Sequence, residues 1–216
     1  MRGGPVIAVD GPAAAGKGTL ARKLAEALEL PYLDTGLLYR AVGRLALDAG
    51  QDPAQPAQKF AQALTPADMQ RKDLRTPEVA LAASKVAAQP AVRAALVETQ
   101  RRFAAERGAV LDGRDIGTAI FPDADVKLFI TASPATRALR RFLQSGGNTS
   151  AADAQAQLGQ MEEALRARDE ADASRDSAPM CVADDAYEIE TDTLDAQAVL
   201  AEALRFARER LVTTRG

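Results

Sequence analysis

The chain has 216 residues, 47% of them hydrophobic and 26% charged, with a formal net charge of −3 at pH 7. This length and composition predict one globular domain with a sizeable core, and the near-neutral charge argues against a dedicated nucleic-acid or membrane-surface binder. The sequence has no histidine and one cysteine, Cys181, which excludes serine–histidine and cysteine–histidine catalysis, an internal disulfide and a cysteine-rich zinc site. No apolar run approaches a membrane span, and the first apolar stretch leads into a loop rather than a signal-peptide site, so we expect a cytoplasmic protein.

Predicted strands and helices alternate along the chain, which is typical of an α/β fold with a parallel sheet covered by helices on both faces. Strands are predicted over Val6–Asp10, Pro31–Asp34, Ala109–Asp112, Val126–Thr131 and Tyr187–Thr191. Helices are predicted over Gly18–Leu28, Gly36–Ala49, Pro77–Ala87, Ala91–Arg107, Pro134–Ser145, Ala151–Ala173 and Asp195–Leu211. Residues 51–70 predict a linker with one short helix, and the polar stretch 145–157 predicts the tip of a helical hairpin.

The stretch GPAAAGKGT follows the first predicted strand and opens the first helix. It fits the P-loop pattern G-x-x-x-x-G-K, here followed by Gly-Thr, in which backbone N–H groups bind phosphate oxygens. Lys17 is expected to reach the β- and γ-phosphates of a nucleoside triphosphate, and Thr19 to offer its hydroxyl to Mg²⁺. The alternative is a glycine-rich turn with a solvated lysine, which the strand and helix on either side disfavour. The predicted ATP-binding residues are Gly11, Pro12, Ala13, Ala14, Ala15, Gly16, Lys17, Gly18 and Thr19.

Polar residues also follow the second and third predicted strands, at the edge where ligands bind in open parallel sheets. In LDTGLLYR, Thr35 and Arg40 follow the second strand, and Arg40 is a candidate phosphate ligand or a plain surface arginine. Asp112 ends the third strand, in the arrangement that holds Mg²⁺ or its waters in P-loop enzymes. Arg114 and Asp115 come next, and they either form a simple ion pair or belong to a second ligand site.

Two predicted helices carry clustered charges. RALRRFLQ places three arginines within about one turn, either as a solvated face or as a clamp on a transferred phosphoryl group. In RARDEADASRDSAPM, Arg168, Asp172 and Arg175 are spaced four and then three apart, so that a helix would align one carboxylate between two guanidinium groups. Taken alone, this second cluster is best explained as an exposed charge ladder.

Six segments resemble, in the same order, the signature segments of bacterial cytidylate kinases: DGPAAAGKGTLA, LDTGLLYR, EVALAASKVAAQPAVR, DGRDIGTAIFPDA, RALRRFLQ and RDEADASRDSAP. The resemblance covers nearly the whole chain, and its GRDIGT and R-D-x-x-D-x-x-R-x-x-A-P segments are far more specific than the P-loop. It implies a P-loop kinase fold with a five-stranded parallel sheet, a lid and a short nucleoside-monophosphate-binding (NMP-binding) insertion. It also implies transfer of phosphate from ATP, with Mg²⁺, to CMP or dCMP. The expected single domain covers 1–216, with a core at about 1–36, 108–134 and 174–216, the insertion at about 37–107 and the lid at about 135–173.

The resemblance further assigns roles to single residues. The CMP site would comprise Thr35, where many relatives have serine; Arg40, Arg114 and Arg175 on the phosphate; Ser84, Arg93 and Asp115 on cytosine; and Arg168 and Asp172 on the sugar hydroxyls. The catalytic set would be Lys17, Arg114, Arg175 and the lid arginines Arg137 and Arg141, and the metal would lie at Thr19 and Asp112, through water or directly.

Elementary chemistry makes the cytosine assignment reasonable. A carboxylate at Asp115 can accept a hydrogen bond from the N4 amine of cytosine, and a guanidinium at Arg93 can donate to N3 or O2. Uracil would instead place a carbonyl against the carboxylate, at a cost of about 1–3 kcal/mol per unpaired group. The stretch between Asp48 and Glu78 is shorter than in many relatives and poor in β-branched and aromatic residues, so we do not expect the small β-sheet that they carry there.

Two alternatives remain open at this stage. One is another P-loop small-molecule kinase, acting on UMP, AMP or shikimate. The other is a non-catalytic nucleotide switch, which would release no ADP in response to an acceptor. For the cytidylate kinase interpretation we expect the small-molecule partners CMP or dCMP and ATP, no nucleic acid or membrane partner, and a monomer.

Overall fold

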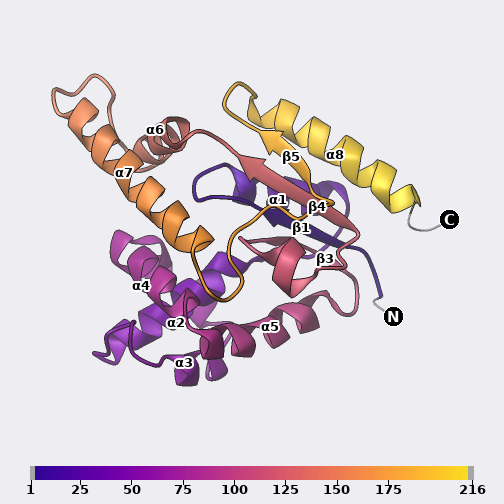
Figure 1. Cartoon of the computed structure of the whole chain (residues 1–216), viewed down its shortest axis with the longest axis horizontal. Helices are drawn as coiled ribbons and strands as arrows, with labels where there is room; N and C mark the ends of the chain where they lie inside the picture. The colour runs from indigo at the N-terminus through magenta and orange to yellow at the C-terminus, as the bar shows by residue number, and fades with distance from the viewer. Residues whose placement is uncertain (1–2, 214–216) are drawn as a thin grey trace.

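The structure is a computed structural model and describes residues 3–213. Its five strands are parallel and form one sheet in the order β2-β3-β1-β4-β5. The strands are β1 (Val6–Asp10), β2 (Tyr32–Asp34), β3 (Ala109–Asp112), β4 (Val126–Thr131) and β5 (Tyr187–Glu190). The helices are α1 (Lys17–Ala27), α2 (Thr35–Asp48), α3 (Gln58–Gln62), α4 (Pro77–Ala87), α5 (Pro90–Ala104), α6 (Pro134–Gln144), α7 (Ala154–Ala173) and α8 (Ala196–Thr213). Figure 1 shows the strand arrows pointing toward the end of the molecule where α2, α4 and α7 gather, and both termini at the other end.

Helices cover both faces of the sheet, as the alternation of elements predicted. All of β1 is buried because its side chains enter two different cores. Ile7 and Val9 pack with residues of α1 and α8, whereas Val6 and Ala8 pack on the opposite face with Ala104 at the end of α5. The predicted α/β fold with a five-stranded parallel sheet is therefore confirmed.

The strand register sets the edge from which the functional loops leave. Val9 of β1 lies opposite Asp112 of β3, and Asp34 of β2 lies opposite the same residue. Because parallel strands end at the same edge, the P-loop after Asp10, the start of α2 and the loop after β3 all begin side by side.

All regular elements between β2 and β3 in the described structure are helices. Besides α2 to α5 this segment contains two short 3₁₀ turns, Asp68–Gln70 and Lys72–Arg75, and no strand among its described residues. Leu38 and Val42, one turn apart on α2, pack against Val86 of α4 and Leu96 of α5 in a small separate core. The expectation that this stretch does not build a β-sheet is confirmed.

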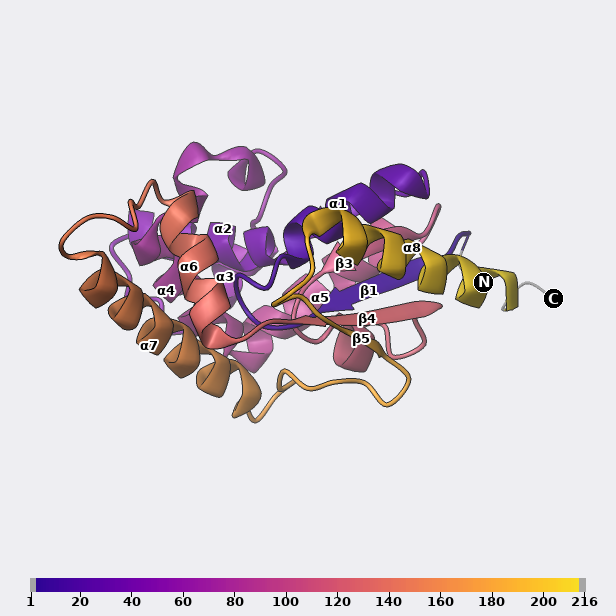
Figure 2. The ribbon, with the colours of Figure 1, turned by 90° about the horizontal axis from the view of Figure 1, so that it is seen from above.

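Helices α6 and α7 form an antiparallel hairpin that projects from the end of β4 (Figures 1 and 2). Within the described residues, a small hydrophobic cluster joins the hairpin to the rest of the fold, in which Ala138, Met161 and Leu165 pack against Ala13 of the P-loop. Polar contacts at the base of the hairpin therefore have a large share in setting its position.

Element boundaries differ from the predictions by a few residues. Helix α7 begins at Ala154 rather than Ala151, because Asn148 first closes a turn in which its side chain accepts a hydrogen bond from the Ser150 amide. Helix α5 ends at Ala104 rather than Arg107. A π-helical turn over Ile116–Ile120 was not predicted, and it depends on a tertiary contact described below.

Candidate active site

The P-loop has the backbone that its glycines predict. Gly11 has a φ of 135°, and a Cβ built on it would lie 2.0 Å from the Ile130 carbonyl oxygen of β4. Gly16 has a φ of 96° and immediately precedes α1. The loop can therefore curl against the sheet and present the positive end of the α1 dipole to an anion.

Lys17 is folded back into this loop. Its Nζ donates to the Pro12 carbonyl at 2.9 Å and lies 3.8 Å from an oxygen of Asp112, and the side chain is 5% exposed. Burial, followed by the nearby Arg114 guanidinium, lowers the pKa of Lys17 to about 8, whereas the Asp112 carboxylate acts in the opposite direction. An anion in the P-loop would oppose this lowering and favour the charged ammonium.

The two residues predicted to hold the metal, Asp112 and Thr19, differ in their exposure to solvent. Asp112 is buried, with burial the main cause of its raised pKa, and a Cβ added to Gly18 would lie 3.0 Å from its Oδ2. Gly18 thus leaves space at the carboxylate that a side chain would fill, whereas Thr19 is exposed on the next position of α1. The described residues contain no group of three or more metal-ligating side chains. A single carboxylate with free space suits Mg²⁺, which is usually held by one or two carboxylates together with waters and substrate phosphates.

Two residues expected in the CMP site lie in the first two turns of α2. The Thr35 hydroxyl donates to the Asp112 carbonyl at 2.7 Å, which joins α2 to the end of β3. Arg40 donates to the Leu74 carbonyl at 2.9 Å, so it is not a plain surface arginine. Burial, followed by repulsion from Arg141 of the hairpin, lowers the pKa of Arg40.

The residues expected to read the base form a buried pair. Arg93 of α5 donates to Asp115, which directly precedes the π-helical turn, and their side chains are 5% and 7% exposed. Burial raises the pKa of Asp115, and Arg93 opposes that shift. The Arg93 guanidinium lies 5.8 Å from the centre of the Tyr39 ring. The half-buried Ser84 donates to the Ala80 carbonyl of its own helix at 3.4 Å.

The simple ion pair considered for Arg114 and Asp115 is wrong, because each has another partner. Arg114 Nε donates to Asp172 Oδ2 at 3.0 Å, across 58 residues of sequence. Asp172 also accepts from Arg175, and its side chain is 1% exposed. The exposed charge ladder is therefore also wrong.

The predicted helical alignment around Asp172 needs a correction as well. Helix α7 ends at Ala173, so Arg175 reaches Asp172 from beyond the helix. The second guanidinium on Asp172 is Arg114 rather than Arg168. Arg168 Nε is buried and has no hydrogen-bond partner within the described residues. Burial, followed by repulsion from Arg114, lowers the pKa of Arg168 to about 10.

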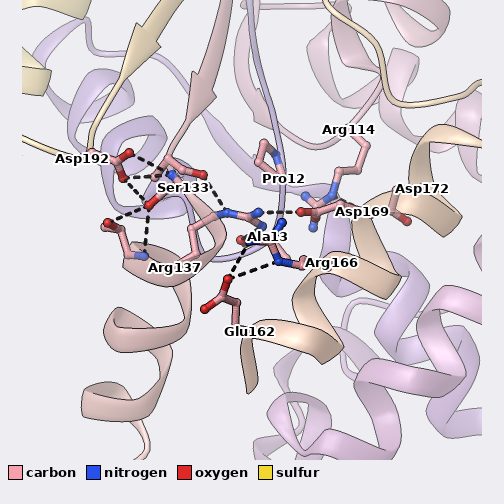
Figure 3. A network of polar contacts seen from close by, with 12 residues as sticks. Pro12, Ala13, Arg114, Ser133, Arg137, Glu162, Arg166, Asp169, Asp172 and Asp192 are labelled. Carbon is pink, nitrogen blue, oxygen red and sulfur yellow. Dashed lines mark hydrogen bonds and ion pairs between the residues drawn. The ribbon is translucent and has the colours of Figure 1, made fainter. Parts of the chain in front are cut away.

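The two lid arginines have different surroundings. Arg137 is buried, and its three nitrogens donate to the Ala132 carbonyl at 2.9 Å, the Ala13 carbonyl at 3.1 Å and Asp169 Oδ2 at 2.6 Å (Figure 3). Arg141 is half-buried and repels both Arg40 and Arg168. Arg141 is thus placed toward the expected acceptor site, whereas a phosphate contact by Arg137 stays a prediction.

Three further features of the site were missed by sequence reasoning. Asp10 accepts from the amides of Ile116 at 2.9 Å and Gly117 at 2.7 Å, which holds the π-helical turn, and burial raises its pKa to about 7. Its position at the end of β1 was an available signal, equivalent to that of Asp112. The other two, the Arg75–Asp34 ion pair at 3.1 Å and the Arg137–Asp169 ion pair, gave no local signal because their partners are distant in sequence.

Together these residues give the site a clear electrostatic character. Arg40, Arg114, Arg141 and Arg168 act on one another as like charges from three different elements and a loop, and Lys17 lies beside them. Such clustering favours binding of a multiply charged anion opposite the P-loop. The fold and the site define a P-loop phosphotransferase with an anionic acceptor.

Comparisons with known proteins give the family. The family model for cytidylate kinase matches residues 7–209. A cytidylate kinase of Granulibacter bethesdensis is 57% identical over 207 residues, covering 95% of this chain and 97% of the relative, and one of Acidiphilium cryptum is 57% identical over 195 residues, covering 88% and 89%. The chain belongs to the cytidylate kinase family.

A solved structure supports the fold alone. An uncharacterized protein from Eubacterium ventriosum superposes with a TM-score of 0.50 at 14% identity, covering 94% of this chain and 98% of that one. Within residues 3–213, each helix is too short or too polar to cross a membrane.

Proposed function

We propose that this chain transfers the γ-phosphoryl group of ATP to CMP or dCMP, giving ADP and CDP or dCDP. Membership of the cytidylate kinase family supports the reaction. The observation in the structure that supports it best is the buried Arg93–Asp115 pair, which lies next to Arg114 at the edge of the sheet where the P-loop begins. This pair offers a donor and an acceptor of the kind that the Watson–Crick edge of cytosine requires.

The donor side of the mechanism rests on the P-loop. Backbone N–H groups from Gly11 to Thr19 bind the ATP phosphates, and Lys17 leaves the Pro12 carbonyl to contact the β- and γ-phosphates. Asp112 would hold Mg²⁺ through water or directly, with Thr19 as the second predicted ligand. When bound, Mg²⁺ neutralises charge on the β- and γ-phosphates.

The acceptor side rests on guanidinium groups. Arg40, Arg114 and Arg175 bind the CMP phosphate and bring one of its oxygens into line with the γ-phosphorus. Lys17 and the lid arginines Arg137 and Arg141 stabilise the charge that spreads over the equatorial oxygens in the transition state. No covalent intermediate with the protein is needed, which agrees with the absence of histidine and the exposed position of Cys181.

Base and sugar recognition follow from the remaining residues. Cytosine would accept from Arg93 at N3 or O2 and donate from N4 to Asp115, with Ser84 beside them. Arg168 has a buried Nε–H that lacks a protein acceptor among the described residues, so a sugar hydroxyl would remove an unpaired donor. Asp172 orients Arg114 and Arg175 and is the proposed second sugar contact.

The proposed organisation follows these roles. The chain would be a single kinase domain with its core at about 1–36, 108–134 and 174–216, an NMP-binding insertion at about 37–107 and a lid at about 135–173. Closure of the lid would exclude water from the γ-phosphate. The proposed oligomeric state is a monomer, and the expected compartment is the cytoplasm.

The test is a panel of acceptors. Purified protein receives ATP and Mg²⁺ with CMP, dCMP, UMP, AMP or shikimate, and ADP release is measured by anion-exchange chromatography. We expect the highest kcat/KM with CMP or dCMP. A higher value with any other acceptor would contradict the proposed substrate, and ADP release that no acceptor stimulates would favour the nucleotide switch.

A further inference from the structure

Arg137 joins three separate parts of the molecule. Its guanidinium donates to the Ala13 carbonyl in the P-loop, to the Ala132 carbonyl just after β4 and to the Asp169 carboxylate on α7 (Figure 3). The Arg137 side chain is 3% exposed, so water cannot replace these acceptors at low cost. Asp169 therefore fixes the C-terminal part of α7 against the loop that is proposed to bind ATP.

Asp169 lies within the stretch of α7 that carries the proposed sugar contacts. Arg168 precedes it directly, and Asp172 follows one helical turn later and binds Arg114. A continuous series of contacts thus runs from the P-loop through Arg137 and Asp169 to the residues that face CMP. Among residues 3–213, the hydrophobic cluster at this junction consists of Ala13, Ala138, Met161 and Leu165, so the ion pair contributes much of the connection.

We propose that Asp169 is a positioning residue that couples occupancy of the P-loop to affinity for CMP. ATP phosphates bound to the P-loop amides hold the Ala13 carbonyl in place. The Arg137 guanidinium is then held, and through Asp169 it holds α7 where Arg168 and Asp172 meet the acceptor. By thermodynamic reciprocity CMP tightens ATP binding by the same factor. This inference rests on the proposed function, since it requires ATP and CMP at these two places.

The test compares CMP binding with and without a donor analogue. Isothermal titration calorimetry gives the Kd of CMP alone and in the presence of saturating AMP-PNP and Mg²⁺, and the ratio of the two values is the coupling factor. Coupling factors between sites are typically about 5- to 150-fold. For Asp169→Asn and Asp169→Ala we expect this factor to fall at least about fivefold, toward 1.

A matched control exists on the same helix. Glu162 forms an ion pair with Arg166 at 2.7 Å, and the Arg166 side chain is largely exposed. Within residues 3–213, no hydrogen bond or ion pair joins either residue to the P-loop. Glu162→Gln should keep the wild-type coupling factor. Thermal unfolding of all variants verifies folding. Asp169→Asn removes the carboxylate charge that holds Arg137 while keeping the size of the side chain, so it serves as the test if Asp169→Ala does not fold.

The outcomes separate the two proposals. If the wild-type protein fails to phosphorylate CMP, the proposed function fails. If it phosphorylates CMP but shows a coupling factor of 1, or if the folded Asp169 variants keep the full factor, the inference is wrong. If the Asp169 variants bind CMP more weakly by the same factor with and without AMP-PNP, the inference is also wrong. Asp169 would then affect CMP affinity without coupling it to the P-loop.

Discussion

Replacement of Asp115 by asparagine tests how the enzyme reads the base. Asparagine keeps the size and one acceptor oxygen of Asp115, so the pairing with Arg93 is weakened but not removed. Its amide can also present an N–H group to the O4 carbonyl of uracil, which the carboxylate cannot do. The variant should therefore lose preference for CMP over UMP while keeping the P-loop chemistry.

The size of the effect follows from the burial of the pair. The Asp115 side chain is 7% exposed, so a mismatched carbonyl cannot be solvated there and costs about 1–3 kcal/mol. Because 1.4 kcal/mol is a factor of ten, the ratio of kcat/KM for CMP to that for UMP should fall by roughly 5- to 150-fold. Asp115→Ala should in addition destabilise the protein by about 3–5 kcal/mol, since it leaves Arg93 charged, buried and unpaired.

The assay is the initial rate of ADP release with each acceptor, for wild type, Asp115→Asn and a control. Asp184→Asn removes an exposed carboxylate before β5 and should leave the CMP/UMP ratio unchanged. Urea unfolding measures the free energy of unfolding of each variant. An unchanged CMP/UMP ratio in a folded Asp115→Asn variant would refute the base-reading role.

Three further predictions concern the P-loop. Lys17→Ala should lower kcat with every acceptor by at least about tenfold without changing the CMP/UMP ratio, because its charge acts on the transferred group; a changed ratio in the acceptor panel would contradict this. The pKa of Lys17 is about 8 before ATP binds, and a bound phosphate raises it, so at pH 8–9 ATP binding should take up a proton and weaken as the pH rises. Calorimetry in two buffers of different ionisation enthalpy measures the uptake, and an unchanged uptake in Lys17→Met would contradict this. Gly11→Ala should destabilise the fold by at least about 1–3 kcal/mol in urea unfolding, since φ is 135° and the Cβ would lie 2.0 Å from the Ile130 carbonyl; Gly16→Ala, with nothing within 4 Å, should cost less.

The sequence by itself determined most of the fold. Apolar runs and helical periodicity along the chain were enough to predict all five strands and their parallel arrangement. The signal was clearest for β1 and β3, which are buried along their whole length and are therefore mostly apolar. The P-loop could also be predicted from the sequence, because its glycine conformations and the helix that follows it are local properties of the chain. The order of the six motifs along the chain also indicated the family, and the family resemblance supplied the list of expected site residues.

Only the tertiary structure decided which charges pair. Arg114 could have bound its neighbour Asp115, yet it binds Asp172 across 58 residues, and Asp115 binds Arg93 instead. The π-helical turn after Asp115 likewise depends on Asp10, which is 106 residues away from Ile116. Long side chains such as arginine reach several partners from one backbone position, so the choice among carboxylates depends on burial and on the meeting of elements in space. Sequence spacing identifies neighbours along one helix, whereas these pairs join a strand end or a loop to an element that is distant in sequence.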